Sequence, residues 1–216
     1  MGIISRFPAG ATKPYIEEIY NSDGQLIDVK MYGYKTIRDS AFSGCPSLAL
    51  TTLPSGITNI GDYAFSGCSS LALTTLPNGI TNIGQGAFES CSSLALTTLP
   101  SEITNIGQEA FYGCTNLALT TLPSGITNIG DYAFSGCSSL ALTTLPSEIT
   151  NIDYRAFVDC TSLVSLTFEG TPERIDDGTF IGCNNLTTIN VPWAEGAVAN
   201  APWGAPNATI HYGYTG

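Results

Sequence analysis

The stretch IGDYAFSGCSSLALTTLP, residues 60–77, decides the fold because close copies of it recur along most of the chain. Residues 54–76 and 123–145 are identical over a full copy. The seven cysteines lie at a constant spacing of 23 residues, as Cys45, Cys68, Cys91, Cys114, Cys137, Cys160 and Cys183. A fixed spacing of this kind indicates a structural repeat, and a period of about 20 to 29 residues is typical of leucine-rich repeats.

Each unit follows the pattern C-x-x-L-x-L-x-x-L-P-x-x-I-x-x-I-G-x-x-A-F-x-x-C. The leucine-rich segment predicts a short strand that ends at the proline, which cannot continue a ladder. Ile57 and Ile60 are expected to point inward, and Ala64 with Phe65 to open a short helical turn. One unit cannot bury its apolar face alone, whereas stacked units can. The pattern therefore predicts an α/β repeat fold, a single right-handed leucine-rich-repeat solenoid of short parallel strands and short helical turns.

The repeat resembles the BspA-like leucine-rich-repeat family over roughly residues 37–192. The phrase that carries the resemblance is I-G-x-x-A-F-x-x-C-x-x-L, present as Ile60, Gly61, Ala64, Phe65, Cys68 and Leu71. This resemblance implies a bacterial surface adhesion module that binds proteins of the host or of other bacteria.

Both ends of the chain depart from the period and predict caps around a solenoid at residues 37–192. Residues 1–36 contain YIEEIYNSDGQLIDVKM at 15–31, which predicts a β-hairpin turning at residues 21–24. Residues 193–216 supply two tryptophans, an alanine-rich helix candidate and a last strand at 209–212, which together form an aromatic cap. This tail resembles the closing segment of repeat proteins encoded by phages and prophages of gut bacteria.

The charge balance excludes two classes of partner. The net charge is −11, with only seven lysines and arginines in 216 residues. Nucleic acids and anionic membranes require a basic surface, so neither is expected as a partner. The sequence has no run of about 20 apolar residues that could span a bilayer. Its amino terminus has no signal-peptide pattern. Localisation is not predicted from these features, and a cell surface or virion location is only implied by the resemblances.

The cysteines are expected to be core residues. Equivalent side chains in a solenoid point the same way, so their Cβ atoms do not converge as a disulfide requires. No C-x-x-C pair or Cys/His cluster suggests zinc. Disulfide, metal and redox roles remain as alternatives to burial.

The register of the central leucine-rich segments leaves two alternatives open. In strict alternation, an exposed leucine ladder would lie beside a threonine ladder and form a binding surface. With a bulge at each Thr-Thr pair, both leucines of the segment would point inward instead. Burying a leucine gains about 1.5 to 3 kcal/mol, and a lost ladder bond costs about 0.5 to 1.5 kcal/mol. These magnitudes favour the bulge. The leucine ladder consists of Leu50, Leu73, Leu96, Leu119 and Leu142, and the threonine ladder of Thr52, Thr75, Thr98, Thr121 and Thr144.

Nothing in the sequence predicts catalysis, a cofactor or a metal. Nucleophilic triads need a histidine beside the nucleophile, and the only histidine, His211, is expected on the surface of the last strand. The glycines recur once per corner and form no phosphate loop.

The sequence therefore predicts a non-enzymatic recognition or adhesion module for protein or glycan ligands. The alternative is a structural or receptor-contact part of a phage or prophage-encoded particle. The units differ from one another mainly after the Ile-Gly corner, where four tyrosines are candidate anchors for a ligand. They are Tyr63, Tyr112, Tyr132 and Tyr154.

Overall fold

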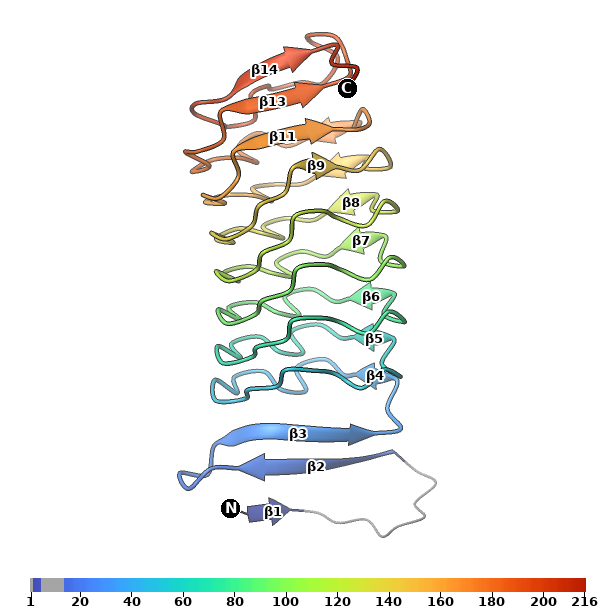
Figure 1. Ribbon diagram of the computed structural model, residues 1–216, viewed down its shortest axis with the longest axis vertical. Helices are drawn as coiled ribbons and strands as arrows, with labels where there is room; N and C mark the ends of the chain where they lie inside the picture. Colours follow the sequence, from blue (N-terminus) through green and yellow to red (C-terminus); the bar gives the residue numbers. More distant parts are fainter. Residues whose placement is uncertain (1, 5–13) are drawn as a thin grey trace.

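The computed structural model describes residues 2–4 and 14–216. Within these residues the chain forms fourteen strands and no helix. Its coils pile up along one axis, with the N-terminal hairpin at one end and the C-terminal strand at the other (Figure 1). The predicted parallel solenoid is present, but its assignment as α/β with helical turns is wrong.

The strands fall into four sheets. An antiparallel sheet has the order β1-β2-β3. Two parallel sheets, β4-β5-β6 and β12-β10-β8-β7, run along one side of the solenoid. A third parallel sheet, β14-β13-β11-β9, lies on the opposite side of the C-terminal coils. The bounds are β1 Gly2–Ile4, β2 Tyr15–Tyr20, β3 Leu26–Tyr32, β4 Thr36–Ile37, β5 Asn59–Ile60, β6 Asn82–Ile83, β7 Asn105–Ile106, β8 Asn128–Ile129, β9 Thr144–Leu145, β10 Asn151–Ile152, β11 Ser165–Phe168, β12 Arg174–Ile175, β13 Thr188–Val191 and β14 Thr209–Tyr212.

The segment predicted as a helical turn is a series of β-turns. Ala64, Ser66 and Cys68 donate backbone hydrogen bonds to carbonyls three residues earlier. The residues between them donate outward instead, as Phe65 does to Ala87 O of the next coil at 2.8 Å. Tyr63 and Gly67 have φ angles of 54° and 74°, outside the right-handed helical region. A helix cannot form here because every second N–H bonds to the neighbouring coil.

The central leucine-rich segments bulge at their Thr-Thr pairs. Leu50 and Leu53 are both buried, whereas Thr51 and Thr52 between them are exposed. Three residues separate the two inward side chains, so the period of two that a strand requires is broken. The sequence predicts a strand in each leucine-rich segment. In the described coils before β9, this segment forms no strand, so that prediction is wrong there. At least one backbone bond to the next coil remains in each of these segments, as between Ala72 N and Leu50 O at 3.0 Å.

The exposed leucine ladder is therefore wrong, and the bulged alternative is the one present. All five leucines lie in the core because burial of their side chains outweighs the lost ladder bonds. They are Leu50, Leu73, Leu96, Leu119 and Leu142.

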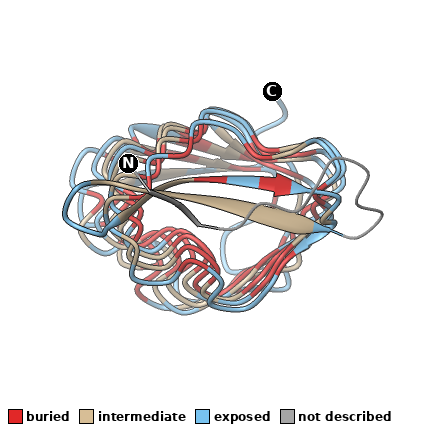
Figure 2. Cartoon of the chain, turned by 90° about the horizontal axis from the view of Figure 1, so that it is seen from below, coloured by how far each residue is buried: buried red, intermediate tan, exposed pale blue. Residues whose placement is uncertain are grey.

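The core is built from columns of equivalent side chains. Viewed along the axis, successive coils follow nearly the same outline (Figure 2). The phenylalanines from Phe42 to Phe180 form a continuous stack with ring centroids 5.4 to 5.6 Å apart. Ile57 and Ile60 are fully buried, as predicted.

The N-terminal end of the solenoid meets the hairpin formed by β2 and β3, which crosses the end of the coils in Figure 2. The turn between them closes through a bond from Gly24 N to Asn21 O. Val29 and Met31 of β3 are buried, and Ile27 O accepts a bond from Ala49 N of the first coil. The hairpin thereby extends the backbone pairing of the solenoid by one strand.

The C-terminal end is closed by aromatic side chains. Trp203 is fully buried, and its backbone carbonyl accepts a bond from Phe180 N at 2.9 Å. Phe168, Trp193 and Trp203 contact one another with ring centroids 5.2 to 6.4 Å apart. The strand expected at 209–212 is β14, which pairs in parallel with β13. The alanine-rich helix candidate is wrong, because residues 194–204 form turns and bends.

Candidate functional site

The thiols form an internal column. Six of the seven cysteine side chains are fully buried, and Cys45 of the first coil is half-buried. Each buried thiol donates to the phenylalanine carbonyl of the preceding coil, as Cys114 Sγ does to Phe88 O at 3.0 Å. No disulfide joins them. The column is therefore part of the packing between coils.

Burial makes these thiols poor nucleophiles. It raises the pKa of the Cys68 and Cys183 thiols to about 12. Burial also raises the pKa of the Cys114 and Cys160 thiols well above its ordinary value. Because the thiolate is the reactive form, the column is unsuited to covalent or redox chemistry at neutral pH.

His211 is exposed on β14, as the sequence predicts. In the described part of the chain, no group of three histidine, cysteine or acidic side chains could hold a metal ion.

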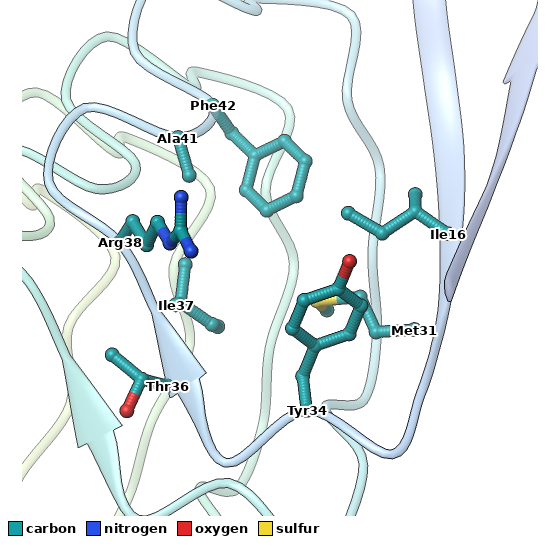
Figure 3. Close-up of a pocket in the computed structure, with 8 residues that line it drawn as sticks. All are labelled: Ile16, Met31, Tyr34, Thr36, Ile37, Arg38, Ala41 and Phe42. Carbon is teal, nitrogen blue, oxygen red and sulfur yellow. The ribbon is translucent and has the colours of Figure 1, made fainter. Parts of the chain in front are cut away.

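A mainly apolar pocket of about 240 Å³ lies between the hairpin and the first coil (Figure 3). Ile16, Met31 and Phe42 point toward the same space, together with the hydroxyl end of Tyr34 (Figure 3). The remaining lining residues are Thr36, Ile37, Arg38 and Ala41. Among the described residues that line it, there is no carboxylate, histidine or thiol.

The predicted threonine ladder lies on the surface, where we call it the threonine row. Four of its five members, Thr52, Thr75, Thr98 and Thr121, are exposed, and Thr144 of β9 is half-buried. The threonine that precedes each of them is exposed as well. The row repeats the same uncharged side chains at every coil.

The four predicted tyrosines lie on the series of β-turns, and we call this surface the tyrosine face. Tyr112 and Tyr154 are each 41% exposed, whereas Tyr63 and Tyr132 are half-buried. Tyr132 contacts both exposed tyrosines edge-on, with ring centroids 6.5 Å from Tyr112 and 5.5 Å from Tyr154. Three of the four tyrosines therefore form one continuous aromatic surface.

Tyr63 belongs to the tyrosine face but not to the continuous aromatic surface of the other three tyrosines. Its ring lies against Gly86 of the next coil, where any side chain would collide with it. Gln85 Nε2 donates to the Tyr63 hydroxyl at 2.6 Å. Burial and the carboxylates of Glu109 and Glu89 raise the pKa of Tyr63.

Sequence reasoning did not select Glu89 and Glu109, which line a surface hollow with Tyr112 and Tyr132. Both glutamates occupy the positions at which the units differ, and this is the same signal that selected the tyrosines. What the sequence does not show is how side chains from neighbouring coils lean toward one another. The described tyrosine face is thus both aromatic and acidic.

These features define a leucine-rich-repeat solenoid with surface positions that vary on one face. The family described as BspA type leucine-rich repeat region, in six copies, matches residues 35–161 and 104–196, well over half of the chain. The chain therefore belongs to the BspA-type leucine-rich-repeat family.

Solved structures of bacterial proteins have a similar fold. A leucine-rich cell surface protein from Faecalibacterium prausnitzii is 28% identical with a TM-score of 0.66, over 86% of this chain and 55% of that one. The Treponema pallidum leucine-rich repeat protein is 29% identical with a TM-score of 0.59, over 87% and 85% of the two chains. The pneumococcal vaccine antigen PcpA shares the fold at 17% identity and a TM-score of 0.59, over 90% and 48%. The chain thus spans about half the length of the first and third structures.

A comparison with functionally curated proteins gives no significant match. Membership in the BspA-type family indicates a protein-interaction or surface-adhesion module, a class of solenoid that is typically non-enzymatic. The predicted resemblance of the tail to phage-encoded proteins finds no support in these matches. None of the described segments forms a helix of the length and apolarity that a membrane span requires.

Proposed function

We propose that the protein is a non-enzymatic recognition module that binds a protein ligand through its tyrosine face. The observation that carries this proposal is the continuous aromatic surface of Tyr112, Tyr132 and Tyr154. These side chains stand at positions that vary between coils whose remaining residues are nearly identical. Tyrosine is enriched at the energetic centres of protein interfaces because it combines a large apolar ring with a polar end.

The columns of the solenoid support this role. A ligand-binding surface must hold its side chains in place, and here each turn is bonded to the next coil. Tyr132 N donates to Tyr154 O at 2.9 Å, and Ser90 N donates to Tyr112 O at 2.6 Å. The backbone beneath the tyrosines is therefore fixed before a ligand arrives, which lowers the entropic cost of binding.

The ends support the same role as caps. We propose that a cap at residues 1–36, of which residues 1 and 5–13 lie outside the described part of the chain, and a cap at 193–216 close a solenoid at 37–192. In support, Ile27 O of β3 accepts a hydrogen bond from the first coil, and Trp203 O accepts one from Phe180 N of the last coil. A location at the bacterial cell surface is also proposed, on the precedent of the Faecalibacterium prausnitzii protein, which is described as a cell surface protein.

The test is a binding assay with the purified chain on a panel of immobilised host extracellular proteins and bacterial surface proteins. The double variant Tyr112→Ser/Tyr154→Ser should lose at least about tenfold in affinity for any ligand found, which corresponds to about 1.4 kcal/mol. Tyr214→Ser is the matched control, because Tyr214 is 44% exposed at the C-terminal end, away from this face.

Two results would contradict the proposal. One is equal binding by the double variant and the control. The other is loss of binding only when the threonine row is changed, for example in Thr98→Ala/Thr121→Ala, which would move the site to that row. A glycan array screened with the same proteins tests the second ligand class that the sequence leaves open.

A further inference from the structure

The hollow on the tyrosine face is lined by two acidic and two aromatic side chains. It measures about 490 Å³ and is lined by Glu89, Glu109, Tyr112 and Tyr132. Glu89 and Tyr112 occupy equivalent positions in successive coils, and so do Glu109 and Tyr132. Each carboxylate therefore stands one coil before a tyrosine, and Glu109 and Tyr112 belong to the same coil, so acidic and aromatic side chains line the hollow together.

The two carboxylates have no cationic partner in the part of the chain that the structure describes. The ion pairs in this part of the chain join Arg174 to Asp153 and to Asp176. Glu89 accepts a hydrogen bond from Ser66 Oγ at 3.0 Å, which orients it but leaves its charge uncompensated. The whole chain carries a net charge of −11, so the surrounding field also attracts cations.

The same face shows how it accommodates a guanidinium group. The Arg155 guanidinium carbon lies 5.0 Å from the ring centroid of Tyr154, within the range of a cation–π contact. Tyr154 in turn touches Tyr132. One step along the aromatic surface, at Tyr112 and Tyr132, carboxylates line the hollow instead of an arginine.

We propose that this hollow receives an arginine side chain of the protein partner, with lysine as a weaker substitute. The proposal rests on the proposed function, because it names the partner chemistry of the same face. An arginine can stack its planar guanidinium on a tyrosine ring while it donates hydrogen bonds to a carboxylate. A lysine can satisfy the charge but not the stacking geometry, so a basic, arginine-bearing protein segment is the fitting partner.

The test uses the full chain and a fluorescein-labelled hexa-arginine peptide, with hexa-lysine and hexa-serine peptides for comparison. Fluorescence anisotropy should show saturable binding of hexa-arginine that weakens with added salt, tighter than hexa-lysine, and no binding of hexa-serine. Glu89→Gln/Glu109→Gln should raise the Kd for hexa-arginine about tenfold while keeping the shape of the hollow.

The matched control is Glu102→Gln/Glu148→Gln. It removes the same number of charges from exposed positions in the Pro-Ser-Glu turns. This control should change the Kd less than about threefold. Equal losses in both double variants would mean that the peptide senses only the net charge, and would overturn the proposal. Absence of saturable hexa-arginine binding would overturn it as well. Unchanged melting temperatures establish that both variants are folded.

The two proposals can fail separately. If the tyrosine double variant loses a protein ligand that Glu89→Gln/Glu109→Gln still binds normally, the tyrosine face stands and the arginine hollow is wrong. If the hollow binds hexa-arginine as expected but no protein ligand depends on Tyr112 or Tyr154, the proposed function is wrong.

Discussion

The central coils and the C-terminal coils solve the same packing problem in different ways. In the C-terminal coils, Leu166 and Phe168 point inward two residues apart, and the segment forms β11. In the central coils, the inward pair is three residues apart, as in Leu96 and Leu99, and the segment forms no strand in the coils before β9. Both arrangements bury their apolar side chains, so burial and not strand pairing is what the coils have in common.

The difference shows which interaction dominates. A buried leucine contributes about 1.5 to 3 kcal/mol, whereas a ladder bond contributes about 0.5 to 1.5 kcal/mol. A segment with the sequence Leu-Thr-Thr-Leu therefore loses part of its backbone hydrogen bonding to the neighbouring coils and buries both leucines. The predictions below test this comparison, beginning with the largest expected effect.

Leu96→Asp should destabilise the protein by about 4 kcal/mol or more, because it places a carboxylate in a fully buried column. Thr97→Asp, one residue later on the exposed side of the bulge, should change stability by less than about 0.5 kcal/mol. Urea unfolding followed by circular dichroism measures both. Similar losses for the two variants would mean that the bulge is absent.

Phe168→Ala should cost about 3 to 5 kcal/mol, and Leu99→Ala at the equivalent central position about 2 to 3 kcal/mol. Phe168 packs against both Trp193 and Trp203, so its removal opens a cavity in the C-terminal aromatic cluster. Only the Phe168 variant should also shift the tryptophan emission to longer wavelength. An unchanged emission spectrum would contradict the packing of the cap.

The reactivity of the thiols should differ between Cys45 of the first coil and the six cysteines of the later coils. Near neutral pH, the half-buried Cys45 should react with a thiol reagent faster than the six buried cysteines, which should react only as fast as the protein unfolds. Seven prompt groups would contradict the buried column and favour the redox alternative.

The same column predicts an alkaline loss of stability. Burial raises the pKa of Cys68 from its ordinary value of 9.0 to about 12, so the folded state favours the protonated thiol. This contribution is complete below pH 9.0 and is lost as the pH rises toward 12. Cys68→Ala should flatten the fall in unfolding free energy over that range, and an identical pH dependence for wild type and variant would refute the assignment.

Ser90→Gly should give the smallest effect, a gain of up to about 1 kcal/mol. Ser90 has a φ of 58° at a position where most other coils have glycine, and a non-glycine residue is strained there. The greater freedom of glycine in the unfolded chain offsets part of the gain. Gly113→Ser is the reciprocal variant and should lose a similar amount, since a Cβ at Gly113 finds ordinary contacts at 3.6 Å. Thermal unfolding of the two variants measures the expected gain in stability of the first and the expected loss of the second.

Much of the fold follows from the sequence. The 23-residue spacing indicates the solenoid, because identical units can bury their apolar faces only against one another. The hairpin at 15–31 and the strand at 209–212 follow from local alternation and turn residues. The tyrosines could be selected since they interrupt an otherwise constant repeat.

Other features were decided only by the tertiary structure. Whether Ala64–Phe65 is helical depends on the acceptor that Phe65 N finds, and the carbonyl of Ala87 in the next coil takes the place of a helical partner. The hollow likewise joins residues 20 and 23 positions apart in sequence, Glu89 with Glu109 and with Tyr112. A repeat pattern specifies which residues share a column. The direction in which side chains lean between columns is set by packing and hydrogen bonds between coils, and these exist only once the coils are stacked.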